Sequence, residues 1–437
     1  MTTTTQLIRA RRFLPLFLTQ LLNAFNDNLF KNAMVLFVVY SVYHSEAQEA
    51  RFSAIASAIF IIPFFVLSAI AGQLADMRDK ARIIRLIKLC EIFIMAAGGT
   101  GLALAWQHIA LETVAIPLML LALFAMGVHS TFFGPIKYAI LPQHLHANEV
   151  LAGTGLVEAG TYLAVLAGTI VAGWISVDTA AIMVMITAVI GYLVSWRVPP
   201  APPMGECEPL DYHFIRASIR LVRTTMHDRR VFLAICAISF FWAIGTVLFV
   251  HFPPLTKNIL QASKEVASLF LVIFSVGVAI GSVIINALLK GKVSARWSPV
   301  SVIAMGVFLV GFEVVCNAWV PHAPKGHLMD VSTFLVQPLA IPLLGTLLGI
   351  AVSGGMFVVP LYAFLTTFVD KSQTARTVAA NNVVNSGAMV LGAAMTGVMT
   401  LIGLRVIDQF LVVAASCLAA AWLGLLLYRA ERAAHED

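Results

Sequence analysis

Apolar segments long enough to cross a membrane follow one another along almost the whole chain. A membrane-spanning helix needs roughly 20 predominantly apolar residues, and hydropathy with proline, glycine and charge breaks divides the 437 residues into twelve such segments. Charged residues make up only 11% of the chain, against about 25% in a soluble domain. The predicted segments are 13–43, 51–75, 83–106, 113–136, 149–175, 179–197, 231–254, 264–289, 298–320, 337–368, 377–402 and 406–428. We therefore expect an all-α membrane protein with twelve transmembrane helices and no large soluble domain.

A proline-rich and then basic segment divides these twelve into two groups of six. We expect an N-terminal six-helix bundle at 1–197, a cytoplasmic linker at 198–230 and a C-terminal six-helix bundle at 231–437. The groups resemble each other, since aligning Gly160 with Gly387 places Glu158 opposite Asn385. Two pseudo-symmetric bundles of parallel repeats are the architecture of major facilitator transporters.

Basic residues predict the orientation of the chain, because cytoplasmic loops carry an excess of lysine and arginine. With the N-terminus inside, 22 lysines and arginines lie on the cytoplasmic side, among them five at 78–88, and five lie on the opposite side. We therefore expect both termini in the cytoplasm. The net charge of +6 reflects this bias and does not indicate nucleic acid binding. The five scattered cysteines predict neither a disulfide framework nor a metal site, and we expect no cofactor.

Polar residues interrupt the first apolar segment at Asn23, Asn26, Asp27, Asn28 and Lys31. Ionisable groups inside a bilayer are costly, so they normally face a protein interior or a water-filled path. The acid and the amine are four residues apart in the favourable order for a helical pair. We interpret this segment as lining a substrate pathway, and the alternative is a buried ion pair that only locks helix packing.

A second motif follows the second segment, where Gly72 and Asp76 precede the basic residues Arg78 and Arg82. It resembles the cytoplasmic signature of the major facilitator superfamily. The glycine would permit close helix approach, and Asp76 would accept hydrogen bonds at the start of a neighbouring helix. We interpret the motif as a latch that gates one end of the pathway.

Further pathway candidates are Lys137, Glu158 and the amides Asn381, Asn382 and Asn385. Lys137 either binds a phosphate or extends its amine to the membrane interface. Glu158 either belongs to the pathway or is a protonated carboxyl in a core. The three asparagines either contact substrate or join helices through hydrogen bonds.

Four other ionisable residues are weaker candidates. Glu91, Glu313 and Asp408 are isolated or near helix ends, and His251 stands at an external helix end. For His251 we expect a cap or a solvent contact.

Several motifs together resemble the bacterial lysophospholipid transporter family of the major facilitator superfamily. They are Gln20 to Asn28 with the pattern Gln-x-x-x-Ala-Phe-x-Asp-Asn, Gly134 to Leu141 with Pro-x-Lys-Tyr-x-Ile-Leu, and Gly155 to Ala159 with Leu-x-Glu-Ala. The resemblance implies that the protein flips lysophospholipids such as lysophosphatidylethanolamine from the outer to the inner leaflet of the cytoplasmic membrane. An acyltransferase with an acyl–acyl-carrier-protein synthetase would then reacylate them. It also implies pathway roles for Asp27, Lys137 and Glu158.

One departure concerns the seventh segment, where some family members carry an arginine after Phe-Trp. Here Phe241-Trp242 is followed by no cation before His251. We take Lys31 as the candidate for the missing charge.

Two other function classes compete with a lysophospholipid flippase. A proton-coupled drug or small-molecule exporter would use Asp27 or Glu158 as the proton carrier, but the fifth segment has no Gly-Pro pair. A membrane acyltransferase is disfavoured because no His-x4-Asp motif occurs, and no P-loop motif indicates ATP hydrolysis. We expect a monomeric inner-membrane transporter that is not an enzyme. Energy coupling and headgroup selectivity stay open.

Overall fold

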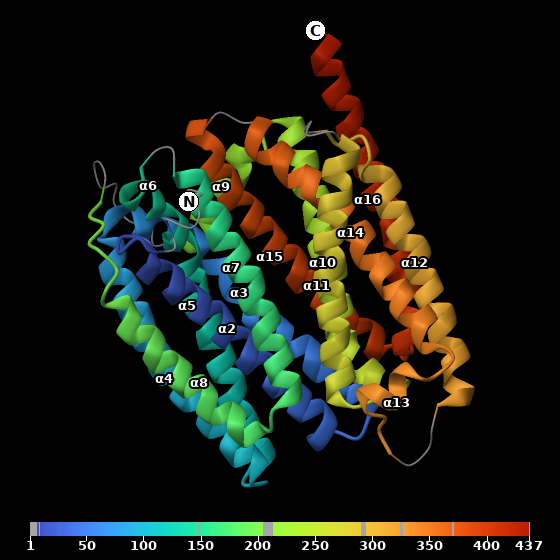
Figure 1. The fold of residues 1–437 in the computed structure, drawn as a ribbon. Helices are drawn as coiled ribbons and strands as arrows, with labels where there is room; N and C mark the ends of the chain where they lie inside the picture. The colour runs from blue at the N-terminus through green and yellow to red at the C-terminus, as the bar shows by residue number, and fades with distance from the viewer. Residues whose placement is uncertain are drawn as a thin grey trace. The chain divides into compact units, whose positions relative to one another are not determined.

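The computed structural model describes residues 7, 9–146, 149–203, 213–289, 294–323, 327–368 and 371–436, and its helices carry most of the chain (Figure 1). Within these described ranges, twelve helices have 19 or more residues, and each coincides with one predicted segment. They are α2 (Leu14–Phe37), α3 (Glu46–Met77), α4 (Lys80–Trp106), α5 (Ile116–Ala139), α7 (Val150–Trp174), α8 (Val177–Ser195), α10 (Arg229–Asn258), α11 (Lys264–Leu289), α12 (Ser298–Trp319), α14 (Ala340–Phe368), α15 (Lys371–Leu401) and α16 (Val406–Glu436).

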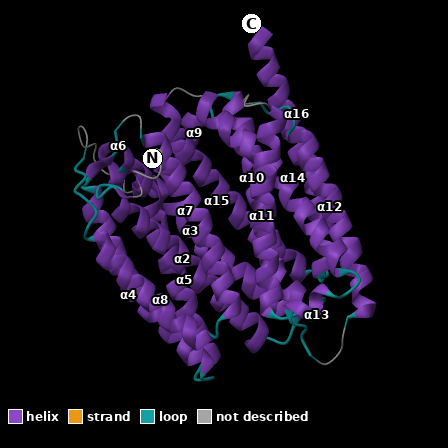
Figure 2. Ribbon diagram, viewed as in Figure 1, coloured by secondary structure: helices purple, strands orange, loops and turns teal. Residues whose placement is uncertain are grey.

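Shorter helical elements connect the long ones. They are η1 (Val38–Val42), η2 (Leu111–Ala115), α6 (Leu141–His144), α9 (Phe214–Thr225), η3 (Val320–His322) and α13 (Val331–Leu335). Figure 2 draws only helices and loops for the described residues, so the predicted all-α class is confirmed.

Aspartates fix the start of two long helices. Asp79 Oδ1 accepts from the backbone N–H groups of Ala81 at 2.9 Å and Arg82 at 3.2 Å, which caps α4. Asp228 Oδ1 likewise accepts from Arg230 N at 2.7 Å at the start of α10. A capping carboxylate satisfies N–H groups that have no partner within the helix.

The helices form two compact units. Unit 1 comprises Met1–Phe37 and Ile62–Ala217, and unit 2 comprises Val38–Ile61 and Ser218–Asp437. Unit 2 therefore holds the segment Val38–Ile61, which the predicted boundaries assign to the N-terminal bundle. The two units are described separately below.

Both units share one packing pattern when the long helices are numbered in chain order from α2 in unit 1 and from α10 in unit 2, with α3, which divides between the units, counted as the second helix of unit 1. In each unit the first helix packs on the fifth and sixth, and the third helix packs on the fourth and sixth. These pairs are α2 with α7 and α8, and α4 with α5 and α8, in unit 1; they are α10 with α15 and α16, and α12 with α14 and α16, in unit 2. Repetition of the same pairs is the internal pseudo-symmetry predicted for the fold.

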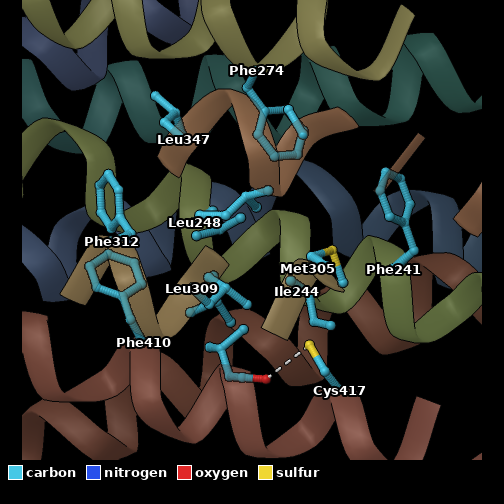
Figure 3. Close-up of a cluster of buried hydrophobic side chains, with 14 of the residues drawn as sticks. Phe241, Ile244, Leu248, Phe274, Met305, Leu309, Phe312, Leu347, Phe410 and Cys417 are labelled. Atoms are coloured by element: carbon cyan, nitrogen blue, oxygen red, sulfur yellow. Dashed lines mark hydrogen bonds between the residues drawn. The ribbon is translucent and has the colours of Figure 1, made fainter. Parts of the chain in front are cut away.

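Unit 2 has an apolar core of interlocking aromatic and aliphatic side chains (Figure 3). Phe312 and Phe410 meet edge to face with ring centroids 5.2 Å apart, an arrangement that aromatic quadrupoles favour. Cys417 belongs to this core, and its thiol donates to the Val413 carbonyl. The core packs α10, α12, α14 and α16 into one body.

Ten described helical segments are long and apolar enough to cross a membrane by length and composition. Helix α2 is outside this set because its asparagines, Asp27 and Lys31 lower its mean hydropathy. Helix α7 qualifies only as the shorter apolar stretch Leu163–Trp174. A polar helix of this length can remain in a membrane protein only where neighbouring helices cover its polar face.

Candidate functional site

Helix α2 carries the polar residues predicted to line a pathway, and the structure buries three of them. Asn23, Asn26 and Asp27 are each at most 7% exposed. Asn23 Nδ2 donates to Asp27 Oδ2 at 3.1 Å, one helical turn away. Lys31 lies a further turn along and is half-buried. We call these residues of α2 (Asn23, Asn26, Asp27, Asn28 and Lys31) its polar stripe. The stripe thus begins with an amide that is hydrogen-bonded to a carboxylate.

Helix α4 supplies partners for this stripe. Lys88 and Glu91 form an ion pair, and their side chains are at most 1% exposed. Asn26 Nδ2 donates to Glu91 Oε1 at 2.8 Å, and Lys88 Nζ donates to Asn23 Oδ1 at 3.3 Å. Two hydrogen bonds therefore join α2 to α4 within unit 1.

Helix α5 completes the group. The Ser130 hydroxyl donates to Asp27 Oδ2, and His129 Nε2 lies 3.5 Å from Glu91 Oε2. We call the whole set the ionic cluster: Asn23, Asn26, Asp27, Lys88, Glu91, His129 and Ser130.

Two glycines make room for this arrangement. A Cβ atom at Gly191 of α8 would lie 2.9 Å from Lys88 Cε, and one at Gly168 of α7 would lie 2.5 Å from the Phe25 carbonyl oxygen. Any larger residue at Gly168 would separate α7 from α2, because a backbone atom cannot move aside. The close approach of α7 to α2 and of α8 to Lys88 therefore depends on these two glycines.

Burial makes the ionic cluster costly to form. Each charge taken from water into a protein interior costs several kcal/mol even after relaxation, and a partner recovers that cost only with good geometry and further hydrogen bonds. Asp27 Oδ1 and Asn26 Oδ1 are buried and have no hydrogen-bond partner among the described residues. A cluster that leaves acceptors unsatisfied is a poor stabilising device, so its presence is better explained by a function.

Four members of the ionic cluster, Lys88, Glu91, His129 and Ser130, were not predicted as site residues. Lys88 is counted among the basic residues of a cytoplasmic loop, yet it lies inside α4 with no exposed surface. Glu91 is set aside as isolated, yet it contacts three side chains. His129 and Ser130 are not singled out at all. The available signal was an acid three residues after a lysine, both within an apolar helix.

The other candidates of unit 1 lie apart from this cluster. Asn28 Nδ2 donates to the Ala24 carbonyl of its own helix at 2.8 Å. Lys137 is half-buried in the last turn of α5, about 12 Å along the helix axis from His129. The side chain of Glu158 lies outside the described residues. The pathway roles of these residues stay predictions.

The asparagines of α15 occupy three different environments in unit 2. Asn385 accepts from Ser239 at 2.8 Å and donates to the Tyr362 hydroxyl at 3.1 Å, which also accepts from Trp242 Nε1 at 2.8 Å. Asn381 is fully buried, and neither of its amide atoms has a hydrogen-bond partner among the described residues. Asn382 is exposed.

The predicted gating motif spans the end of α3 and the start of α4. A Cβ atom at Gly72 would meet no heavy atom within 4 Å, so the expected close approach at this glycine is not seen. The side chain of Asp76 lies outside the described residues, whereas Asp79 accepts from Arg82 N and from Ala201 N at 3.3 Å. Arg78 and Arg82 are exposed. The gating role stays a prediction.

Two residues of α10 differ from expectation. His251 is fully buried and its Nε2 lies 2.8 Å from Gln409 Oε1, so the expected cap or solvent contact is wrong. Lys257 falls between the predicted segments 231–254 and 264–289, yet it lies in the last turn of α10 and binds Glu49 Oε1 at 2.5 Å and the Tyr43 carbonyl at 2.6 Å. Its partner Glu49 is fully buried in unit 2.

A helical membrane protein with two like-packed units and charges buried in its helices has the features of a transporter. The family model of the Major Facilitator Superfamily matches residues 16–353, and the chain belongs to this superfamily. The predicted fold class is thereby confirmed, and the chain is a multi-pass membrane protein.

Sequence relatives indicate a more specific similarity within this superfamily. The chain is 26% identical over 372 residues to the lysophospholipid transporter LplT of Serratia proteamaculans, covering 82% of this chain and 80% of the relative. It is 24% identical over 425 residues to the same transporter of Salmonella arizonae, covering 95% and 96%. The predicted resemblance to lysophospholipid transporters is confirmed.

Solved structures agree on the fold. A bacterial homologue of the human lysosomal transporter Spinster matches with a TM-score of 0.67 at 13% identity, covering 98% of this chain and 97% of that one. A D-xylose–proton symporter matches with a TM-score of 0.66 at 12% identity, covering 95% and 96%.

Proposed function

We propose that this protein transports lysophospholipids across the bacterial inner membrane. The observation that carries the proposal is the coincidence of motif and site. The segment Gln20 to Asn28 bears the pattern shared with lysophospholipid transporters, and Asn23, Asn26 and Asp27 within it belong to the ionic cluster. Gln20 of the same pattern is buried and accepts from Thr161 at 2.8 Å.

The chemistry of these residues fits a phospholipid with one acyl chain. A glycerophosphate headgroup presents acceptor oxygens, so it requires donors such as the amides of Asn23 and Asn28 and the ammonium of Lys31. The acyl chain requires an apolar wall, which the chain's 28 phenylalanines and 16 methionines can provide. Transport proceeds by alternating access, in which the site opens to one side of the membrane at a time.

Finer features of the proposal rest on charge bias and family resemblance. Lysophospholipids such as lysophosphatidylethanolamine move from the outer to the inner leaflet, where an acyltransferase with an acyl–acyl-carrier-protein synthetase reacylates them. Both termini are cytoplasmic, because 22 of the basic residues are then on the cytoplasmic side. The protein acts as a monomer with bundles at 1–197 and 231–437 joined by the linker 198–230.

Reconstitution tests the proposal. The purified protein in liposomes should move fluorescent lysophosphatidylethanolamine from the outer leaflet to a leaflet that albumin cannot extract, and it should leave a fluorescent two-chain phosphatidylethanolamine in place. Asp27→Asn should slow this movement, whereas Asp330→Asn should not, because Asp330 only caps the short helix α13. Lysolipid movement no faster than in protein-free liposomes would refute the proposal.

A further inference from the structure

The amide of Asn381 on α15 is buried in unit 2 without a hydrogen-bond partner. Its side chain is 0% exposed, and neither Nδ2 nor Oδ1 is satisfied by any of the described residues. An unsatisfied buried amide costs free energy, so it requires an explanation, and a bound ligand is one of the few available. Polar groups inside membrane-spanning helices are commonly functional for the same reason.

Asn385, one helical turn further along the same face of α15, provides the contrast. Its Oδ1 accepts from Ser239 of α10 at 2.8 Å, and its Nδ2 donates to the Tyr362 hydroxyl of α14 at 3.1 Å. Asn385 therefore joins three helices, which is one of the two roles predicted for these asparagines. Asn381 makes no such contact with the described residues, so the other role, contact with substrate, is the one that fits it.

The neighbours of Asn385 form a small polar site. Trp242 Nε1 also donates to the Tyr362 hydroxyl, at 2.8 Å. We call Ser239, Trp242, Tyr362, Asn381 and Asn385 the amide site. Trp242 and Tyr362 are half-buried, so the site has a side that a small polar group can reach. Asn385 already uses its donor and its acceptor, whereas Asn381 offers both to a ligand.

The unsatisfied atoms of Asn381 define the chemistry of that ligand. A single group that satisfies both Nδ2 and Oδ1 must accept one hydrogen bond and donate another. Phosphate and ester oxygens only accept and an ammonium only donates, whereas a hydroxyl does both. Lysophosphatidylethanolamine carries one hydroxyl, on the glycerol carbon that lacks an acyl chain. Among the groups of this lipid, the hydroxyl is therefore the complement of the Asn381 amide.

We propose that Asn381 binds the free glycerol hydroxyl of the lysophospholipid and is a specificity-determining residue for lipids with one acyl chain. This inference rests on the proposed transport function. In a two-chain lipid the same oxygen is esterified, so it has no hydrogen to donate and Asn381 Oδ1 stays unpaired. A site built to bind a hydroxyl rejects molecules that lack it, because the buried groups of the site are then left without partners. Selection against two-chain lipids thus uses a hydrogen bond as well as size.

A deoxy analogue separates the hydrogen bond from size. Fluorescent lysophosphatidylethanolamine is compared in proteoliposomes with the same lipid carrying hydrogen in place of the glycerol hydroxyl. The wild-type protein should move the hydroxyl-bearing lipid faster by about tenfold or more. Asn381→Leu should bring this ratio of rates close to one. Thr396→Val should keep the wild-type ratio, because the buried hydroxyl of Thr396 on the same helix donates only to the Gly392 carbonyl, at 3.1 Å.

Thermal unfolding without lipid gives a second readout that does not depend on transport. Asn381→Leu replaces an unpaired amide with an apolar group of similar size, so it should keep or raise Tm. Asn385→Leu breaks two hydrogen bonds and should lower Tm by about 5 °C. A loss of Tm in Asn381→Leu as large as that in Asn385→Leu would show a structural role and overturn the inference.

The transport rates distinguish failure of this inference from failure of the proposed function. Equal wild-type rates for the two lipids would overturn the inference and leave the transport function standing. A wild-type ratio that persists in Asn381→Leu would also overturn it. A wild-type protein that moves neither lipid faster than protein-free liposomes would refute the proposed function, and the inference with it.

Discussion

Replacing Lys88 with methionine is expected to destabilise the protein strongly. Methionine fills much of the same volume but leaves Glu91 buried without its cation. The two side chains are 0% and 1% exposed, so water cannot replace the lost partner. Removing one member of a buried ion pair costs about 3–5 kcal/mol.

Neighbouring contacts adjust this figure in both directions. Glu91 keeps its hydrogen bond from Asn26 at 2.8 Å, which limits the loss. Asn23 Oδ1 loses the donor that lies 3.3 Å away, and an unsatisfied buried acceptor costs about 1–3 kcal/mol. Burial of the methionine side chain returns about 1.5–3 kcal/mol. The expected net loss is therefore about 4 kcal/mol.

Thermal unfolding of the detergent-purified protein measures this loss. A domain of about 200 residues loses roughly 2–4 °C of Tm per kcal/mol, so Lys88→Met should lower Tm by about 10 °C. Arg220→Met changes an exposed cation of α9 and should alter stability by less than about 0.5 kcal/mol. The double variant Lys88→Met with Glu91→Leu should recover most of the loss, because it removes both charges. A single variant as stable as Arg220→Met, or a double variant no more stable than the single one, would refute this reading of the ionic cluster.

Three further predictions concern other contacts. Lys257→Ala should destabilise unit 2 by about 3–5 kcal/mol, because it leaves the buried carboxylate of Glu49 without its cation. A Tm equal to that of the wild type would contradict this prediction. Asp228→Ala should cost about 1 kcal/mol through loss of the α10 cap, whereas Asp228→Asn should retain most of it in chemical unfolding. Burial lowers the pKa of His144, whose Nε2 faces the Pro200 carbonyl. The unfolded chain therefore binds the proton more readily, and stability should be lost as the pH falls from about 6.5. His144→Gln should reduce that loss, and an unchanged pH profile of Tm would count against it.

Hydropathy predicted the helices well because burial in lipid requires long apolar runs. The eighth segment was predicted at 264–289 and α11 is Lys264–Leu289. Differences arise where the chain continues a helix with polar residues or changes its winding. Helix α15 starts at Lys371, before the apolar run begins at 377. Helix α2 ends at Phe37 because η1 follows as a π-helix, whereas the prediction continued to 43.

The candidate site was only half predictable from the sequence. Asn23, Asn26 and Asp27 are conspicuous because they interrupt an apolar segment. Their partners were missed because pairing between helices depends on how α2, α4 and α5 are rotated toward one another, which hydropathy does not report. Lys88 was also misassigned because it follows a run of loop cations, and only the fold reveals that it is turned inward.

The central claim is that the ionic cluster and the polar stripe of α2 contact the lysophospholipid headgroup. The most direct measurement uses lysophosphatidylethanolamine with a photoreactive group on its headgroup, followed by mass spectrometry of the labelled peptides. Label should appear on peptides of α2, α4 and α5 around Asp27, Glu91 and His129, and unlabelled lysolipid should compete it away. Label confined to exposed apolar positions such as Leu163 and Leu193, and unaffected by competitor, would contradict the account.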